Sequence, residues 1–268
     1  GEDQTRSGEG DWLMKKQLFA LLFALLPLTA MAAPLPPQPF SMTPDINDEA
    51  SLQRGMQLYV NYCMGCHSLE HQRFARAATD LDMPQDLVEE NLIFSSELAF
   101  NDQMHIAMQP GDSESWFGVT PPDLTLFNRI KGADYIYSYL LGFYRDPSQP
   151  LGVNNIVLEA SAMPNVLEPL QGVQEMVCSE SDRPLPGAEL DPLTGKYQSC
   201  EVLQITRPGS MEPDEFEAAM YDLTNFLVYV GEPSKLQAQA MAPKVLLFIF
   251  IFGVIAYLLK REYWRDVH

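Results

Sequence analysis

Residues 63–67 read Cys-Met-Gly-Cys-His, which places two thiols and an imidazole within five residues. Two thiols that are two residues apart can add to the two vinyl groups of one haem. The His that follows can offer its imidazole to the iron from the same side. The C-x-x-C-H spacing is the pattern of covalent haem attachment. The motif therefore predicts one covalently bound haem c, linked through Cys63 and Cys66, with His67 as an iron ligand.

Two other kinds of site use cysteines at this spacing. Thioredoxin-like redox sites need no His at this place and lie in a βαβ context, and a zinc site needs a second pair of ligands. Cys178 and Cys200 could supply such a pair, although they are not spaced as C-x-x-C. Haem attachment is the favoured interpretation, with the zinc and redox sites as alternatives.

Residues 14–32 have the three parts of an export signal. They begin with the basic Met14-Lys15-Lys16, continue through an apolar stretch at 18–28 and end in Ala30-Met31-Ala32, a small-residue cleavage pattern. We therefore expect a cleaved signal peptide. Residues 1–13 are polar and precede Met14, so we interpret them as a non-native or mis-started leader. Export agrees with covalent haem attachment, which in bacteria takes place outside the cytoplasm.

An uninterrupted apolar run at residues 245–259 predicts a membrane anchor. Lys244 and Lys260 flank the run, and both side chains can extend to the membrane surface. We expect a transmembrane anchor over 238–264, with a tail to 268, and a haem domain over 33–237. The positive-inside rule places the tail in the cytoplasm, because it is basic, and the haem domain in the periplasm at the bacterial inner membrane.

Charge excludes one class of function. The chain has 36 acidic and 17 basic residues and a net charge of −19 at pH 7. Nucleic-acid binding needs a basic face, so we expect no nucleic-acid partner. A negative field can attract a positively charged protein and raise its rate of association. Solubility alone explains the same composition, and composition does not separate the two.

Two amphipathic helices are expected to form the core. Asp48 can cap a helix that leads to Cys63, with apolar positions at Leu52, Met56, Tyr59 and Val60. Residues 213–230 form a second helix, with Pro213 near its start and acidic residues in its first turn. We expect the two helices to pack together. No β pattern of consequence is present, so the predicted fold class is all-α.

The haem pocket has candidate walls farther along the chain. Pro121 and Pro122 can present a flat apolar surface, and a Tyr-rich helix over 133–143 could close over the same pocket. Basic residues that could meet the haem propionates are Arg129, Lys131 and Arg145.

A second iron ligand is harder to choose. Met163 lies between Ala162 and Pro164 on a loop whose geometry could aim its sulfur, and Met paired with His is an axial pair of electron-transfer haem proteins. Met163 is one of 13 methionines. Other candidates are His71, Met104, His105 and Met108. In an exported protein, a disulfide between Cys178 and Cys200 is also expected.

Several stretches, in this order, resemble the bacterial cytochrome c1 family, which supplies the haem c subunit of the ubiquinol–cytochrome c reductase (bc1) complex. They span residues 51–264 and read SLQRGMQLYVNYCMGCHSL, WFGVTPPDLTL, KGADYIYSYLLGFYRDPSQP, SAMPNVL, LTNFLVYVGEP and YLLKREYW. The resemblance implies a class I cytochrome c-like domain on one C-terminal transmembrane helix. It also implies Met163 as the distal iron ligand. Mitochondrial members carry an Arg directly before PPDL, where this chain has Thr120, which leaves Arg129 as a candidate propionate partner.

The resemblance further implies an electron-transfer role beside two other subunits, cytochrome b and the Rieske iron–sulfur protein. The chain would take one electron from the Rieske protein and pass it to a soluble cytochrome c, and would make no bond itself. Two rival functions remain: a catalytic or sensing haem protein with an open iron position, and a membrane-tethered carrier that works without a quinol-oxidising core.

Overall fold

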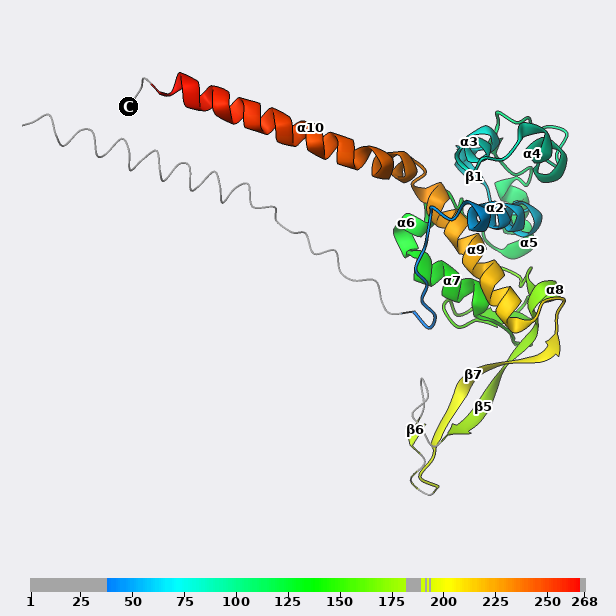
Figure 1. Cartoon of the computed structure of the whole chain (residues 1–268). Coiled ribbons are helices and arrows are strands. Elements are labelled where there is room, and N and C mark those ends of the chain that lie inside the picture. Colours follow the sequence, from blue (N-terminus) through cyan, green and yellow to red (C-terminus); the bar gives the residue numbers. More distant parts are fainter. Residues whose placement is uncertain (1–37, 182–188, 191, 193, 266–268) are drawn as a thin grey trace, which may run out of the picture. The chain divides into compact units, whose positions relative to one another are not determined.

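The computed structural model describes residues 38–181, 189–190, 192 and 194–265. The predicted leader and signal peptide, residues 1–13 and 14–32, lie outside these ranges. Figure 1 shows helices grouped around α2 (Glu49–Leu58) and the longer α9 (Pro213–Gly231), and a β ribbon that leaves the group and returns to it.

Helix α2 (Glu49–Leu58) begins where the sequence predicts. The Asp48 carboxylate accepts a hydrogen bond from the Ser51 N–H at 3.0 Å and so satisfies one of the free donors at the helix start. Leu52 and Met56 lie on the buried face, as expected for residues four apart. The helix continues into η1 (Tyr59–Cys63), a single π-helical turn.

Helix α9 (Pro213–Gly231) confirms the helix that the sequence predicts over residues 213–230. Glu212 and Glu215 form a reciprocal capping box at its start, and Pro213 occupies the first turn, where no N–H partner is required. The buried stripe contains the six apolar residues Phe216, Met220, Leu223, Phe226, Leu227 and Val230. This stripe supplies one wall of the core.

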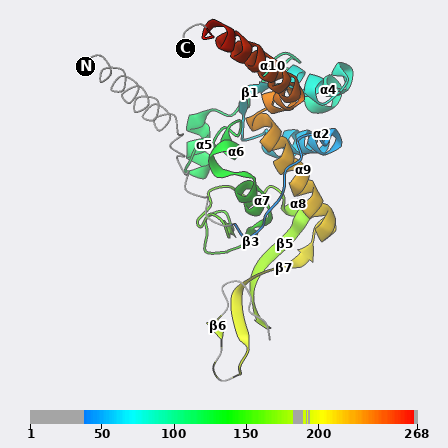
Figure 2. The same cartoon turned by 60° about the vertical axis from the view of Figure 1, so that its left-hand side comes forward.

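Helices α2 and α9 pack directly against each other, side by side in both views (Figures 1 and 2). The contact is closest at Gly55, where an added Cβ would lie 2.1 Å from the Asp222 carbonyl oxygen and 2.6 Å from the Phe226 Cβ. Arg54 beside it makes a bidentate ion pair with the largely buried Asp222 carboxylate. A glycine is therefore what allows the two helix backbones to approach.

The remaining helices are short and surround this pair. Helix α7 (Ala133–Leu141) packs on α9 but ends two residues before the predicted end, because Phe143 begins a strand. The short helices are α3 (Phe74–Asp80), α4 (Gln85–Leu92), α5 (Pro110–Phe117), α6 (Phe127–Lys131), α7 (Ala133–Leu141) and α8 (Glu168–Gln171).

Three antiparallel sheets occur among the described residues, so the all-α prediction is too narrow. The largest is a ribbon of β5 (Gly172–Ser181) and β7 (Tyr197–Pro208), with the short β6 (Glu189–Leu190) beside β7. Side chains on both faces of β5, such as Val173, Gln174 and Glu175, are at least half-buried, so the strand lacks the alternation of apolar and polar residues by which a strand is recognised.

The other two sheets are too short to leave a pattern in the sequence. Their strands are β1 (Leu69–Arg73) with β2 (Gln103–Met104), and β3 (Phe143–Arg145) with β4 (Val153–Asn155).

Helix α10 (Ser234–Tyr263) contains the predicted apolar run and begins four residues before the expected anchor. The helix has 30 residues, and an 18-residue stretch within it has a mean hydropathy of 2.3. None of its side chains is buried. At 1.5 Å per residue it is about 45 Å long, enough to cross a hydrocarbon core of about 30 Å. An apolar helix that no protein surface covers fits a membrane anchor.

We predict that Gly55→Ala lowers the free energy of unfolding by at least about 2 kcal/mol, because the added methyl group meets backbone and Cβ atoms of α9 that cannot move aside. Thermal unfolding of the haem-loaded protein in detergent measures the effect. Gly111→Ala in α5 is the matched control, since nothing lies within 4 Å of its added Cβ, and it should be neutral or slightly stabilising. Equal melting temperatures for the two variants would contradict the proposed close approach.

Candidate haem site

The Cys63–His67 stretch forms a tight turn at the end of η1. The N–H groups of Cys66 and His67 both donate to the Cys63 carbonyl, at 3.0 and 2.9 Å, and the Met64 N–H donates to the Tyr59 carbonyl at 2.9 Å. The fully buried Tyr59 donates its hydroxyl hydrogen to the His67 carbonyl. Tyr59 therefore ties the end of the turn back to the helix that precedes it.

The imidazole of His67 is held in one orientation and in one tautomer. Its Nδ1 donates to the Pro122 carbonyl oxygen at 2.7 Å, and a carbonyl can only accept, so Nδ1 carries the proton and Nε2 keeps a free lone pair. Burial lowers the pKa of His67, partly offset by this hydrogen bond and by Asp123. A neutral imidazole whose other nitrogen is hydrogen-bonded is the usual state of a metal-binding His.

Cys63 and Cys66 face the same space as His67, and they form no disulfide. Burial raises the pKa of Cys63 to about 12 and also raises that of Cys66. Reactive redox thiols have a lowered pKa, so this environment does not favour the thioredoxin-like alternative. Among the described residues, no group of three or more His, Cys, Asp or Glu side chains could hold a metal ion, which leaves the zinc alternative without ligands there.

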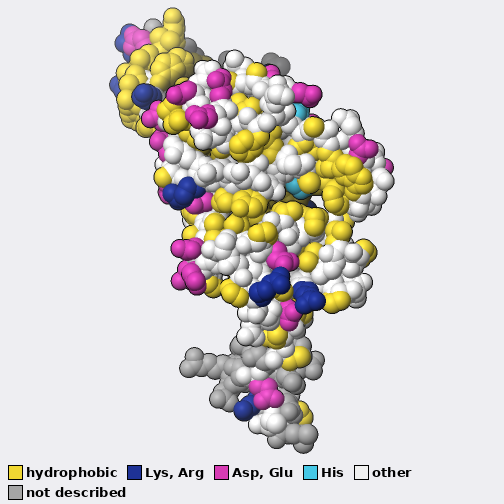
Figure 3. Space-filling model, turned by 90° about the vertical axis from the view of Figure 1, so that its right-hand side faces the viewer, with side chains coloured by type: hydrophobic (Ala, Val, Ile, Leu, Met, Phe, Trp, Pro, Cys, Tyr) yellow, Lys and Arg dark blue, Asp and Glu magenta, His cyan; other side chains and the backbone are white. Residues whose placement is uncertain are grey.

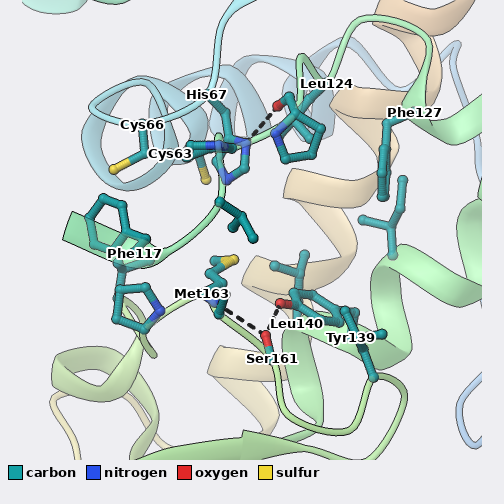
Figure 4. A pocket seen from close by; sticks show the side chains of 18 of the residues that line it. Cys63, Cys66, His67, Phe117, Leu124, Phe127, Tyr139, Leu140, Ser161 and Met163 are labelled. Carbon is teal, nitrogen blue, oxygen red and sulfur yellow. Dashed lines mark hydrogen bonds between the residues drawn. The ribbon is translucent and has the colours of Figure 1, made fainter. Parts of the chain in front are cut away.

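These three side chains open into a cavity of about 390 Å³. Helix α7 contributes Tyr135 and Tyr139, and α9 contributes Leu223 and Leu227. Most of the lining is aliphatic or aromatic, and the volume lies in the range of small-molecule and cofactor sites. Figure 4 shows this space between the Cys63–His67 turn on one side and the loop that carries Met163 on the other.

Met163 lies across the cavity from His67, with its sulfur directed inward (Figure 4). Its loop contains no helix or strand between Ile156 and Val166, and polar contacts give it shape. The Asn154 side chain accepts a hydrogen bond from the Ala160 N–H at 2.9 Å, and the Ser161 Oγ accepts one from the Met163 N–H at 3.3 Å. Two iron-binding donors, an imidazole nitrogen and a thioether sulfur, thus face one apolar space beside two thiols, and this donor set fits a haem c.

Comparison with known proteins agrees with this geometry. The profile of the cytochrome C1 family matches residues 39–171. The chain is 39% identical to the cytochrome c1 of Allochromatium vinosum over 255 residues, which are 95% of this chain and 100% of that protein. The chain belongs to the cytochrome c1 family.

Two further relatives have other names. An ammonia monooxygenase gamma subunit from Nitrosomonas europaea is 40% identical over 224 residues, which are 84% of this chain and 86% of that protein. A cytochrome b/c1 from Bradyrhizobium diazoefficiens is 24% identical over 248 residues, which are 82% of this chain and 34% of that protein.

Members of the cytochrome c1 family carry one covalently bound haem c and transfer electrons within the bc1 complex. This chain therefore carries one haem c, and it is an electron-transfer subunit. When bound, the haem supplies a single iron that changes between the ferric and ferrous states.

The predicted pocket residues fall into two groups. Pro121 and Pro122 line the cavity, as the double-Pro motif suggests. Arg129 does not line it and instead lies against α9, where its Cγ is 3.4 Å from the position of a Cβ built on Gly231. Lys131 does not line it either, but its Nζ lies 5.1 Å from the ring centre of Tyr135, which does. The role of Arg129 toward a propionate stays a prediction.

The other candidate ligands are not among the residues that line the cavity. Met104 is fully buried in the core beside β1, and His105 contacts Gln103. His71 and Met108 are also outside the lining.

The sequence predicts that a Tyr-rich helix over 133–143 closes over the pocket, and Tyr135 and Tyr139 of α7 do line it. It did not single out the pair Tyr139 and Ser161, whose hydroxyl groups meet beside Met163 at 2.6 Å.

The Cys178–Cys200 pairing stays a prediction, although the backbone is compatible with it. Cys178 is disulfide-bonded. In the register of β5 and β7, Val177 pairs with Val202 and Ser179 with Ser199, so Cys178 lies opposite the two residues 200–201 at a bulge. The Cys200 side chain lies outside the described part of the chain.

We predict that proteolysis without reductant releases one linked peptide pair that contains Cys178 and Cys200. In the chain-entropy view this disulfide contributes roughly 3 kcal/mol to the free energy of unfolding. A reductant should therefore lower the melting temperature of the wild type but not that of Cys178→Ser. Labelling of a free Cys200 thiol in the unreduced wild type would refute the pairing.

Proposed function

We propose that Cys63 and Cys66 form the two thioether links to the haem, and that His67 and Met163 bind its iron from opposite sides. One observation carries the proposal: a neutral imidazole and a thioether enter one apolar cavity from facing walls, next to both thiols. The subunit takes one electron from a Rieske iron–sulfur protein and passes it to a soluble cytochrome c. No bond is made or broken in this step, so the chain itself needs no acid, base or nucleophile.

The surrounding residues position and shield these groups. The Pro122 carbonyl orients His67, and the Tyr59 hydroxyl secures the turn that carries it. Apolar side chains exclude water from the space between the two ligands. With His67 and Met163 both bound, the iron would keep no open position, which argues against a catalytic or sensing haem protein. The crossing of α2 and α9 beside the C-x-x-C-H turn supports a class I cytochrome c-like domain.

The membrane arrangement follows from α10 and the charges beyond it. Lys260 and Arg261 lie in its last turn and Arg265 follows, so the positive-inside rule supports a cytoplasmic C-terminus and a periplasmic haem domain at the inner membrane. This orientation agrees with a cleaved signal at residues 14–32, which lie outside the described residues.

The partners are proposed from family membership and charge. A cytochrome b subunit and a Rieske protein would accompany the chain in the bc1 complex, and the name cytochrome b/c1 of one relative pairs two of these components. The net charge of −19 would attract a basic soluble acceptor. Figure 3 shows acidic side chains spread over one face of the domain, with basic ones in a few small groups.

A second candidate function is a membrane-tethered carrier outside a quinol-oxidising complex. The observation that favours it is the 40% identity to a protein named as an ammonia monooxygenase gamma subunit. The same haem site would serve either role, so the two differ in the proteins that surround the chain.

We predict that Met163→Ala keeps covalent haem, because the thioether links depend on other residues, but loses the weak far-red absorption band of methionine-bound ferric haem. The reduced variant should bind carbon monoxide, and its midpoint potential should fall, because His/Met ligation raises the potential. Met108→Ala is the control, since Met108 does not line the cavity. An unchanged far-red band in Met163→Ala would show that Met163 is not an iron ligand.

We predict that the tagged protein, purified from its own membranes in mild detergent, shows b-type haem bands beside its c-type band in a reduced-minus-oxidised spectrum. These bands mark a cytochrome b partner. A c-type band alone, persisting in gentler detergents, would favour the tethered carrier.

A further inference from the structure

The loop that carries Met163 depends on side-chain hydrogen bonds for its position. Residues 157–165 form no helix or strand. Most of their hydrogen bonds stay within the loop or go to the flanking Asn154 and Asn155. Among those described, the Glu168 N–H at the start of α8, which directly follows the loop, donates to the Asn165 carbonyl at 3.4 Å, and the bond between Ser161 and Tyr139 is the one that reaches a helix distant in sequence. The loop is therefore attached to α7 at a point two residues before Met163.

The contact at Ser161 joins three groups in a row. Its Oγ lies 2.6 Å from the Tyr139 hydroxyl oxygen and accepts the Met163 N–H at 3.3 Å, and Figure 4 shows both links beside the cavity. Ser161 is 6% exposed, so water cannot easily replace a lost partner. Ala160, directly before it, has a positive φ of 54°, a conformation that costs a non-glycine residue free energy. Contacts on both sides of Ala160 are needed to hold that turn.

Tyr139 is a fixed point to which the loop can attach. Its ring stacks on Tyr135 with 6.2 Å between ring centres and meets Phe143 edge-on at 5.0 Å. Its carbonyl accepts a hydrogen bond from the Asn155 side chain at 2.8 Å. Burial raises the pKa of Tyr139, so its hydroxyl stays protonated at neutral pH. The ring and the backbone thus hold the hydroxyl in place while it bonds to Ser161.

We propose that Tyr139 and Ser161 act together as positioning residues that keep the Met163 thioether directed at the haem iron. The inference rests on the proposed ligand role of Met163. The Tyr139 hydroxyl fixes the Ser161 oxygen, which in turn fixes the Met163 backbone through its N–H. Without either hydroxyl, the loop gains freedom at the residue next to the strained Ala160 turn, and the sulfur is displaced from the iron more often.

The experiment compares Tyr139→Phe, Ser161→Ala and the double variant in the haem-loaded, detergent-solubilised protein. Each should keep covalent haem but show a weaker far-red methionine band. Carbon monoxide binding to the reduced protein should increase about threefold to tenfold, the effect expected from the loss of one hydrogen bond between neutral groups. The midpoint potential should fall, by about 59 mV if the effect is tenfold. The double variant should match the single ones, because the two residues form one link.

Two controls separate positioning from general stability. Tyr137→Phe removes a hydroxyl from the same helix that bonds to Glu217 at 3.1 Å and does not line the cavity, so its band and potential should equal the wild type. Ser161→Thr keeps a hydroxyl and should restore the band lost in Ser161→Ala. This second comparison also covers the case in which Tyr139→Phe does not fold.

Met163→Ala, measured alongside, distinguishes the two ways of failing. If it abolishes the band while Tyr139→Phe and Ser161→Ala leave the band, the potential and carbon monoxide binding unchanged, the positioning role is wrong and the ligand role stands. A lower melting temperature with an unchanged band and potential overturns it equally. If Met163→Ala itself keeps the band, the ligand role fails, and the positioning role fails with it.

Discussion

The close packing of α2 on α9 at Gly55 sets the position of the haem turn. The Asp222 carbonyl and the Phe226 Cβ occupy the space where any side chain at position 55 would extend. Helix α2 is therefore fixed against α9 about one turn before Tyr59, and η1 carries the chain from there directly into Cys63. Because α9 also lines the cavity through Leu223 and Leu227, one contact aligns the haem-binding turn with the part of the cavity wall that α9 supplies.

The two sides of the cavity are held by different kinds of interaction. On the His67 side, backbone hydrogen bonds to Cys63 and a buried tyrosine secure the turn, and a carbonyl orients the ring. On the Met163 side, side chains of Asn154 and Ser161 replace regular secondary structure. Backbone hydrogen bonds are independent of side-chain identity, whereas side-chain bonds depend on single residues. The Met163 side is thus the one on which substitutions can adjust the site without disturbing the haem attachment.

The parts of the molecule that the sequence predicts are those with a short-range pattern. Capping residues and the spacing of apolar residues identify α2 and α9, unbroken hydropathy identifies α10, and the spacing of Cys63, Cys66 and His67 identifies the chemistry. The β5–β7 ribbon was missed because both faces of β5 are partly covered, so no two-residue period appears there, and because the alternation in β7 is confined to the four residues 203–206. The link between Tyr139 and Ser161 was missed for another reason: it joins residues 22 apart that meet only after α7 and the loop have packed.

Polarity connects the site to its role as an electron carrier. The proposed ligands are both neutral: burial favours the neutral form of His67, the Pro122 carbonyl places its proton on Nδ1, and the thioether of Met163 has no charge. Ferric iron bears one more positive charge than ferrous iron, and an apolar cavity disfavours that extra charge. A Met ligand acts in the same direction. The environment built by α7, α9 and the Pro121–Pro122 wall thus favours the reduced state of the haem iron, so the subunit accepts an electron readily. Which protein takes that electron from it depends on the surface of the domain.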